Sequence, residues 1–343
     1  MSGKIKVLVV DDSPSVRRII TGILNADPDI HVIGVAQDGV EGIKLIKALN
    51  PDVVTLDIVM PRLTGIGVID WVMKTNPVRI LVISSITREN AQTTLVALEK
   101  GAVDFITKPS ATNIDAIRDE ILAKVKAIAA IPMEKIAPSF KAPEVQDVGK
   151  IEVFVRSHVK AIGIGLSAGG PSTLLTLLSA LPENFPLPIL VVQHMPKFFT
   201  SEFAMSLNAK CAIMVKEAEN EEAVKPSTVY IAPGGKQMLV FKEKIVLTNH
   251  APVNGQKPSV DVLFTSLAQD YGSEAMGMVL TGMGNDGLAG ARQIRAAGGR
   301  IVAQDPATAI VLGLPKAVID AGLANRVLAL NRIPQFLINL TRG

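Results

Sequence analysis

Residues 5–13 read Ile-Lys-Val-Leu-Val-Val-Asp-Asp-Ser, an apolar run that ends abruptly in two carboxylates. A run rich in Val and Ile, in which apolar residues do not alternate with polar ones, is typical of a parallel strand covered on both faces. Four more such runs follow, at residues 31–36, 53–56, 80–83 and 103–106, and amphipathic stretches such as 16–25, 40–49 and 91–100 lie between them. Five such units within about 125 residues predict a doubly wound, five-stranded parallel sheet.

The same alternation resumes beyond residue 153. Apolar runs occupy residues 161–166, 189–192, 229–232, 245–247, 276–280 and 300–303. Helical patterns follow several of them, so we expect a second doubly wound and mostly parallel α/β domain. Between the two regions, Pro132, Pro138 and Pro143 each remove a backbone donor and interrupt any apolar period. The predicted organisation is therefore a first domain over 1–128, a proline-containing linker over 129–153 and a second domain over 154–343.

Composition excludes several classes of function. Lys plus Arg number 35 and Asp plus Glu 32, a net charge of +3 that argues against a general polyanion binder. Aromatic residues, at 4%, are too few for the stacking platforms that bind single-stranded nucleic acid. Cys211 is the single cysteine, which excludes a disulfide framework and suits a reducing compartment. Since no apolar run approaches the roughly 20 residues of a membrane span, we expect a cytoplasmic protein. We also expect it to be a monomer.

Polar residues stand at the strand ends of the first domain. Asp11 and Asp12 follow the first run, Asp57 ends the third, Ser84 ends the fourth and Lys108 follows the fifth. Such groups converge at one edge of an open parallel sheet. Any one of them read alone could be a helix cap or a solvated strand end. Together they predict a phosphoacceptor switch: carboxylates suit Mg²⁺, Asp57 can form an acyl phosphate, and Lys108 and Ser84 can respond to its charge.

Three motifs in this region resemble the receiver domain of two-component response regulators, a flavodoxin-like fold. They are Val9-Val-Asp-Asp-Ser13, Thr55-Leu-Asp-Ile-Val-Met-Pro-Arg-Leu63 and Thr107-Lys-Pro109. The resemblance implies that a partner histidine kinase phosphorylates Asp57, with Mg²⁺ held by Asp11, Asp12 and Asp57. One departure is Thr64, which stands where many receivers carry an acidic residue.

Residues 163–171 of the second domain read Gly-Ile-Gly-Leu-Ser-Ala-Gly-Gly-Pro, at the end of an expected strand. One interpretation is a dinucleotide loop, whose glycines let a pyrophosphate approach a helix N-terminus. That interpretation needs an acidic residue at the end of the next strand, which instead runs into Gln193 and His194. The other is Gly165-x-Ser167-x-Gly169, a strand–turn–helix that exposes a serine hydroxyl beside the backbone donors of a helix. The sequence favours the second.

Two other strand ends supply partners for this serine. His194 follows the run 189–192, and Asp286 follows the run 276–280. Each could by itself be a cap or a turn residue. Taken with Ser167 they form a nucleophile, a base that takes its proton, and a carboxylate that orients the base. The chain order Ser–His–Asp differs from the Ser–Asp–His order of α/β-hydrolases, which disfavours that particular fold.

The second domain resembles the catalytic domain of the chemotaxis protein-glutamate methylesterases, the CheB family. The matching segments are Gly165-Leu-Ser-Ala-Gly-Gly170, Val191-Val-Gln-His-Met-Pro-Lys-Phe-Phe-Thr200, Tyr230-Ile-Ala-Pro-Gly234, Lys257-Pro-Ser-Val-Asp-Val-Leu-Phe264 and Thr281-Gly-Met-Gly-Asn-Asp-Gly287. The resemblance implies hydrolysis of glutamate methyl esters on chemoreceptors without a cofactor in the hydrolase site, and often deamidation of receptor glutamines. It also implies that the Met283 amide donates to the oxyanion and that the unphosphorylated receiver inhibits the hydrolase. Ala168 stands where family members often carry Thr, so the missing hydroxyl bears first on the deamidase activity.

The sequence disfavours two other classes of function. A DNA-binding response regulator would carry a short helix-turn-helix domain with a basic recognition helix, and no basic cluster of that kind occurs in the second half. A non-catalytic adaptor on the hydrolase fold is disfavoured by the presence of Ser167, His194 and Asp286 together. A serine-directed activity probe would separate the adaptor from the enzyme.

Overall fold

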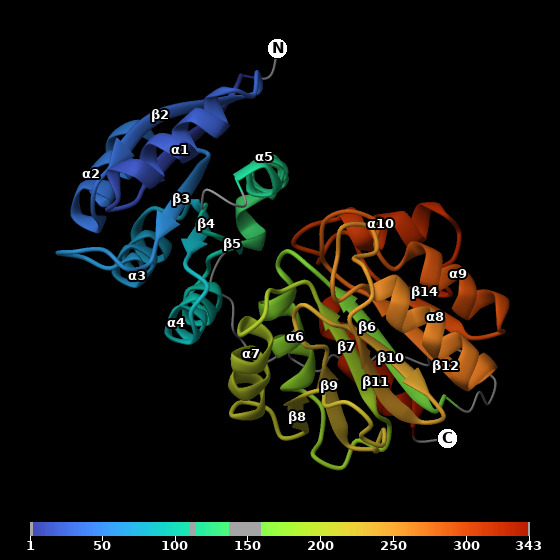
Figure 1. The fold of residues 1–343 in the computed structure, drawn as a ribbon. Helices are drawn as coiled ribbons and strands as arrows, with labels where there is room; N and C mark the ends of the chain where they lie inside the picture. Colours follow the sequence, from blue (N-terminus) through green and yellow to red (C-terminus); the bar gives the residue numbers. More distant parts are fainter. Residues whose placement is uncertain (1–2, 110–113, 137–158, 342–343) are drawn as a thin grey trace. The chain divides into compact units, whose positions relative to one another are not determined.

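The computed structural model describes residues 3–109, 114–136 and 159–341. The chain divides into two units, Met1–Phe140 and Lys141–Gly343, each with its own sheet (Figure 1). Residues 137–153 of the expected linker, together with His158, lie outside the described residues. The two units are considered separately.

A five-stranded sheet forms the centre of the first unit, in the order β2-β1-β3-β4-β5, and every neighbouring pair is parallel. The strands are β1 (Ile5–Val10), β2 (Ile30–Ala36), β3 (Val53–Asp57), β4 (Arg79–Ser84) and β5 (Asp104–Thr107). The helices are α1 (Pro14–Asn25), α2 (Gly39–Leu49), α3 (Gly65–Thr75), α4 (Arg88–Glu99) and α5 (Ile114–Ala129). Helices α1 and α5 pack together, and α2, α3 and α4 form a second row. The prediction of a doubly wound, five-stranded parallel sheet is confirmed.

Short polar side chains begin four of these helices. Ser13, Asp38, Thr64 and Thr87 each accept a hydrogen bond from a backbone N–H in the first turn of the helix that follows. Such N-caps satisfy donors that the helix itself cannot pair. Thr64 therefore has a structural role at the start of α3.

The first residues of the expected linker remain packed on the first unit. Beyond α5, Ile131 and Ile136 are buried, and Met133–Lys135 form a short 3₁₀ helix. Arg79 in β4 donates from its Nε to the carbonyl oxygen of Ile131 at 2.8 Å. The proline at position 132 interrupts the helix, but the chain continues along this unit as far as residue 136.

A seven-stranded sheet forms the centre of the second unit, in the order β14-β13-β12-β6-β7-β9-β8, again with every pair parallel. The strands are β6 (Ala161–Leu166), β7 (Ile189–Gln193), β8 (Met214–Glu217), β9 (Thr228–Ile231), β12 (Ala275–Val279), β13 (Arg300–Gln304) and β14 (Arg326–Leu328). A separate antiparallel hairpin comprises β10 (Gln237–Phe241) and β11 (Lys244–Thr248). The predicted mostly parallel α/β domain is confirmed, and the run 245–247 belongs to the hairpin.

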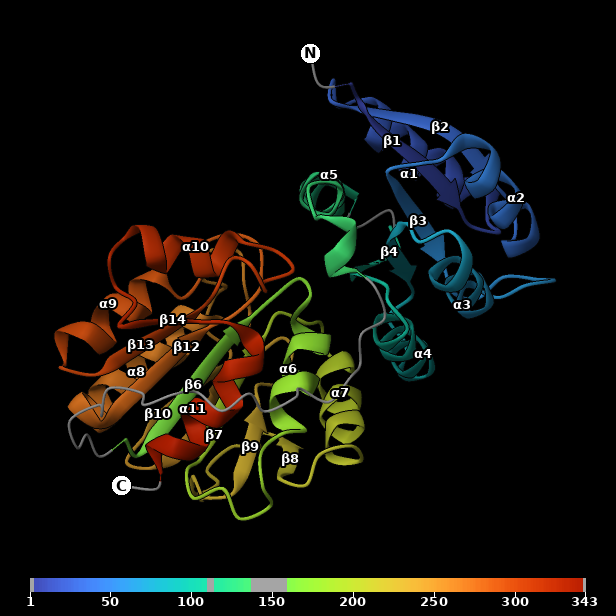
Figure 2. The same cartoon turned by 180° about the vertical axis from the view of Figure 1, so that it is seen from behind.

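Helices cover both faces of this sheet. They are α6 (Gly170–Leu178), α7 (Phe199–Asn208), α8 (Val260–Tyr271), α9 (Leu288–Ala296), α10 (Gly313–Asp320) and α11 (Ile333–Leu340). Figure 1 shows α8 and α9 in front of the sheet, and Figure 2, from behind, shows α11 on the other face. Helix α6 packs against α11, and α8 packs against β6 and β12.

Glycines in β6 let α8 approach the sheet closely. A Cβ atom at Gly163 would lie 2.5 Å from Leu267 Cδ1, and one at Gly165 would lie 2.4 Å from Val260 Cγ1. Both contacts are far shorter than van der Waals distance, so a larger side chain would push the helix away. These two glycines therefore serve helix–sheet packing, which explains a glycine pattern that also fits a dinucleotide loop. The close packing brings the N-terminus of α8 to the carboxyl ends of β6 and β12.

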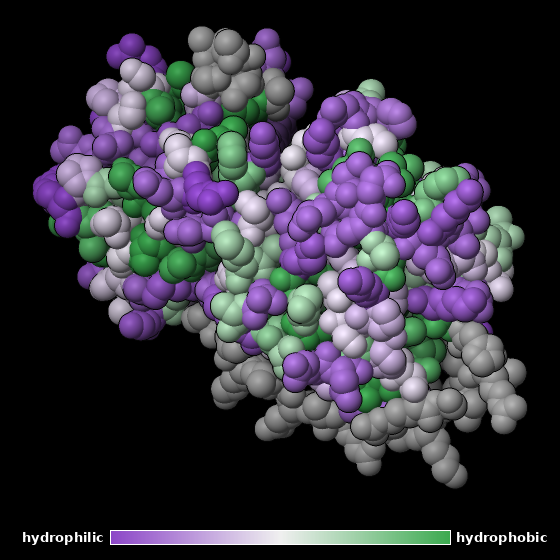
Figure 3. All heavy atoms as spheres, turned by 60° about the horizontal axis from the view of Figure 1, so that its bottom comes forward, coloured by the Kyte–Doolittle hydropathy of each residue, from purple (hydrophilic) through white to green (hydrophobic). Residues whose placement is uncertain are grey.

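Within the described residues, no helix is both long and apolar enough to cross a membrane. The face of the molecule in Figure 3 mixes hydrophilic and hydrophobic residues across its surface.

Candidate functional sites

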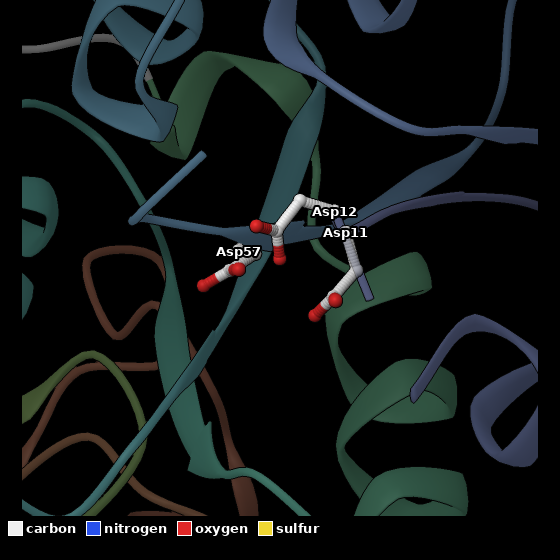
Figure 4. Close-up of side chains that lie close together, drawn as sticks. All are labelled: Asp11, Asp12 and Asp57. Carbon is white, nitrogen blue, oxygen red and sulfur yellow. The ribbon is translucent and has the colours of Figure 1, made fainter. Parts of the chain in front are cut away.

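The predicted carboxylates of the first unit lie together at one edge of its sheet. Asp11 and Asp12 follow β1, and Asp57 ends the adjacent strand β3. One oxygen from each of the three carboxylates lies within 4.8 Å of the others (Figure 4). Lys108, just after β5, places its Nζ 2.7 Å from Asp57 Oδ2 and 3.4 Å from Asp11 Oδ2.

Burial shapes the electrostatics of this cluster. It raises the pKa of Asp57 to about 6, although the hydrogen bond and charge of Lys108 act in the opposite direction. Burial also raises the pKa of Asp11. Burial alone would lower the pKa of Lys108, but its contacts with Asp57 and Asp11 raise it above its ordinary value. Three carboxylates face one ammonium group, so the negative charge of the cluster is only partly compensated. This donor set fits a hard divalent cation.

Ser84 lies beside this cluster and is held by α4. A cavity of about 240 Å³ is lined by residues that include Asp57, Ser84, Asn90 and Lys108. The buried Ser84 hydroxyl accepts a hydrogen bond from Thr94 Oγ1 at 2.8 Å. The sequence pattern did not single out Thr94, because a threonine in the middle of a helix carries no local signal of function. Asp57, Ser84 and Lys108 thus line one cavity.

In the second unit, the three predicted residues follow three neighbouring strands. Ser167 follows β6, His194 follows β7 and Asp286 comes after β12, and β6 lies between the other two strands. Because all three strands are parallel, their carboxyl ends meet at one edge of the sheet. Across the sheet, the strands that lead to these residues lie in the order β12 (Asp286), β6 (Ser167) and β7 (His194).

His194 and Asp286 form a direct, buried hydrogen bond. The Nε2 atom of His194 lies 2.8 Å from Asp286 Oδ2, and the two side chains are 7% and 3% exposed. The second ring nitrogen, Nδ1, is buried and has no hydrogen-bond partner in the structure. Among the hydrogen bonds of the described residues, none joins the Ser167 hydroxyl to His194. Since Asp286 occupies Nε2, Nδ1 is the nitrogen left to act as a base.

The Asp286 carboxylate accepts several hydrogen bonds. It receives the backbone N–H groups of Val260 (2.7 Å) and Asp261 (3.0 Å) as well as the hydroxyl of Ser259 (2.8 Å). Burial by itself would raise the pKa of Asp286. The hydrogen bond and charge of His194 and the two backbone donors outweigh burial and hold the pKa below its ordinary value. Asp286 is thus fixed in its charged form.

The backbone around Ser167 is held on several sides. Its N–H donates to the Thr281 carbonyl at 3.0 Å, and its own carbonyl accepts from Gly170 N and from Gln193 Nε2. A Cβ atom at Gly282 would lie only 2.7 Å from the Cβ of Ser167. The backbone at Gly282 therefore lies directly against the serine. The Ala168 side chain is buried and offers no hydroxyl here.

Thr281 joins the serine loop to a neighbouring loop. Its buried hydroxyl donates to the Ala168 carbonyl at 2.9 Å and accepts from Val311 N at 2.9 Å, and its N–H donates to Gln304 Oε1. Thr281 belongs to the motif 281–287, but nothing in the sequence indicates this role for it. The Thr281 hydroxyl therefore connects the loop of Ala168 to the loop of Val311 through hydrogen bonds to the backbone of each.

Replacing Thr281 with valine is expected to destabilise the second unit by about 1–3 kcal/mol, because buried backbone groups lose their partner. Valine has nearly the same shape, so the loss reports the hydroxyl and not a cavity. Chemical denaturation of the wild type and the variant measures it. Thr176→Val, which removes a half-buried hydroxyl bonded only within α6, is the control and is expected to cost clearly less. Equal stability of Thr281→Val and the wild type would contradict the role of this hydroxyl.

Comparisons with known proteins match both units to known families. The family model described as CheB methylesterase matches residues 162–337, and the response regulator receiver domain model matches residues 7–121. The chain is 40% identical to the protein-glutamate methylesterase/protein-glutamine glutaminase of Pyrococcus horikoshii, over 98% of this chain and 94% of the relative. It is 41% identical to protein-glutamate methylesterase/protein-glutamine glutaminase 2 of Vibrio vulnificus, over 99% of each.

A solved structure extends this similarity to the fold. The crystal structure of the Thermotoga maritima CheB methylesterase catalytic domain matches 54% of this chain and 100% of its own, with a TM-score of 0.51 and 42% identity. The fold and the two sites thus define a response regulator that joins a receiver to a hydrolase. The chain belongs to the CheB methylesterase family. The resemblance drawn from the sequence motifs is confirmed.

Proposed function

We propose that this chain is a phosphorylation-regulated hydrolase that removes methyl groups from glutamate methyl esters of chemoreceptors. The observation that carries the proposal is the buried bond between His194 and Asp286, on strands that flank the strand leading to Ser167, in a chain of the CheB methylesterase family. A methyl ester is the proposed substrate since relatives that match nearly the whole chain are named as methylesterases.

In the proposed reaction, Ser167 attacks the ester carbonyl and its proton passes to Nδ1 of His194. Asp286 holds the ring through Nε2 and stabilises the imidazolium that forms. The backbone N–H of Met283 stabilises the oxyanion. Methanol leaves with the proton from His194, and a water molecule, deprotonated by the same nitrogen, then releases the glutamate and restores Ser167.

The receiver is proposed to control this reaction through Asp57. A partner histidine kinase supplies the phosphoryl group, and Asp11, Asp12 and Asp57 would hold a Mg²⁺ ion that offsets the negative charge during transfer. Lys108, which already contacts Asp57, pairs with the new phosphoryl charge, and Ser84 turns from Thr94 toward it. Phosphorylation then relieves inhibition of the hydrolase by the receiver.

Acetyl phosphate with Mg²⁺ is expected to raise the rate of receptor demethylation by about 5–150-fold, the usual range for coupling between two sites. Methanol release from methylated receptor membranes measures this rate. Asp57→Asn keeps the shape of the acceptor but cannot form the acyl phosphate, so it should keep the basal rate and lose the activation. Activation of Asp57→Asn to the wild-type level would overturn the assignment of Asp57.

Deamidation of receptor glutamines is a second proposed activity of the same site. It is favoured by the names of the relatives, which include protein-glutamine glutaminase. The acyl-enzyme would be the same, with ammonia in place of methanol as the leaving group. Because Ala168 offers no hydroxyl beside Ser167, any help to the poorer leaving group must come from His194. The cytoplasmic location and the monomeric state stay predictions.

A further inference from the structure

Ser259 lies at the start of α8 but does not use its side chain as helix-capping serines do. An N-cap serine ordinarily accepts a hydrogen bond from a backbone N–H in the first turn of its own helix. The Ser259 side chain makes no such bond. Its hydroxyl instead donates to Asp286 Oδ1 at 2.8 Å, and the residue is completely buried.

Asp286 provides the cap that Ser259 does not. Its carboxylate accepts from the N–H groups of Val260 and Asp261, the first two residues of α8. A carboxylate at the N-terminus of a helix is stabilised by the unpaired donors and by the helix dipole. The Asp286 carboxylate therefore faces His194 on one side and the start of α8 on the other.

The hydroxyl of Ser259 is itself fixed in place. The backbone N–H of Ser259 donates to Gln237 Oε1 at 2.9 Å, which ties this residue to the hairpin strand β10. Since Oδ1 accepts from Ser259 and Asp261, the carboxylate can turn its other oxygen, Oδ2, only toward His194 Nε2 and Val260 N. Ser259 supplies a side-chain hydroxyl that, beside the backbone donors of Val260 and Asp261, holds the rotation of the carboxylate about its Cβ–Cγ bond.

We propose that Ser259 is a positioning residue of the hydrolase, whose hydroxyl orients the Asp286 carboxylate toward His194. This inference rests on the proposed function for the roles of Ser167, His194 and Asp286. It adds a fourth side chain that never contacts the substrate and acts through the aspartate. The three residues of the mechanism come from three different strand ends. Ser259 links one of them, Asp286, to the start of α8.

A second carboxylate near this position has a different task. The titratable groups that face Asp286 are His194, after β7, and Asp261, in α8. The Asp261 carboxylate accepts from Gly290 N at 2.7 Å and from Asn254 Nδ2 at 2.8 Å. It thereby caps α9, which begins just after Asp286, and it does not contact His194. The two aspartates cap each other's helices, and only Asp286 belongs to the reacting group.

The test compares Ser259→Ala with the wild type in two assays. The first is receptor demethylation, in which kcat should fall about tenfold, the change that corresponds to a lost hydrogen bond to a charged group, while KM stays unchanged. The second is the rate at which a fluorophosphonate labels Ser167, which depends on the catalytic residues and not on the natural substrate. This rate should fall by a similar factor.

The pH dependence of labelling separates positioning from a general loss of structure. Removing a donor from Asp286 raises the pKa of that carboxyl, so the acid-side inflection of the labelling profile should move to higher pH. Ser259→Thr keeps a hydroxyl and should restore most of the rate. Ser266→Ala removes another buried hydroxyl of α8, bonded to Val240 N and the Leu263 carbonyl, and should leave the profile in place.

The outcomes distinguish this inference from the proposed function. If the wild type is labelled at Ser167 and Ser259→Ala shows the same rate and the same profile, the positioning role is wrong. A loss in Ser266→Ala equal to that in Ser259→Ala, with no change of profile in either, would also overturn it. If Ser167 is labelled but receptor esters are not cleaved, the proposed substrate fails while the comparison of labelling rates still tests Ser259.

Discussion

Replacing Ser167 with alanine is expected to lower the rate of methyl ester hydrolysis by at least about 10⁴-fold, as loss of the nucleophile does in serine hydrolases. Alanine removes only the hydroxyl. The hydrogen bonds that hold this turn use the backbone N–H and carbonyl of Ser167, so they survive the change. Thermal unfolding should therefore be unchanged within the error of the measurement, while methanol release from methylated receptor membranes is lost.

Ser179→Ala is the matched control for this experiment. Ser179 follows α6 in the same unit, and within the described part of the chain its hydroxyl bonds to the Thr176 carbonyl alone. Full activity is expected in this variant. Substantial turnover by Ser167→Ala, with the Ser179 control intact, would exclude Ser167 as the nucleophile and with it the acyl-enzyme mechanism.

Replacing Asp286 with asparagine is expected to lower kcat by about 10⁴-fold, because the amide cannot hold the histidine in the required tautomer or stabilise its charge. This change should also destabilise the unit. The carboxylate accepts from Ser259, Val260 and Asp261, and an amide group presents an N–H to some of these donors in its place. We expect a loss of about 1–3 kcal/mol in the free energy of unfolding. Steady-state kinetics and chemical denaturation measure the two effects.

Asp261→Asn separates the two effects. Asp261 is a buried carboxylate of the same helix region that caps α9, and among the hydrogen bonds of the described residues none joins it to His194. Its replacement should cost comparable stability but much less activity. If Asp286→Asn lost no more activity than Asp261→Asn, the low activity would reflect the helix packing, and Asp286 would not be the partner of the base.

The strands and the two sites could be predicted because their signal is local. Unbroken Val and Ile runs mark buried parallel strands, and a polar residue directly after such a run must lie at the sheet edge. The strand ends predict Asp11, Asp57, Ser84 and Lys108 at one edge and Ser167, His194 and Asp286 at another, where the structure has them. Strand order was not needed, since neighbouring parallel strands bring their carboxyl ends together in any order.

Other features depend on contacts between distant segments. The bond of Ser259 to Asp286 spans 27 residues, and that of Thr281 to Ala168 spans 113. A serine directly before a helix predicts an N-cap. The bond of the Ser259 hydroxyl to Asp286 instead depends on the packing of α8 against β6, which the sequence does not show. Strands β8, β10 and β14 were not predicted. β8 (Met-Val-Lys-Glu) and β14 (Arg-Val-Leu) are short and contain charged residues, whereas β10 (Gln-Met-Leu-Val-Phe) is mostly apolar and was missed.

The proposed function requires one chemical change, the conversion of receptor glutamate methyl esters into glutamates by this chain. Mass spectrometry of peptides from a methylated chemoreceptor, before and after incubation with the enzyme and acetyl phosphate, follows that change at each site. We predict loss of the methyl group from specific glutamates, with one methanol released for each. Methyl esters that stay intact while a serine probe labels Ser167 in the same sample would contradict it.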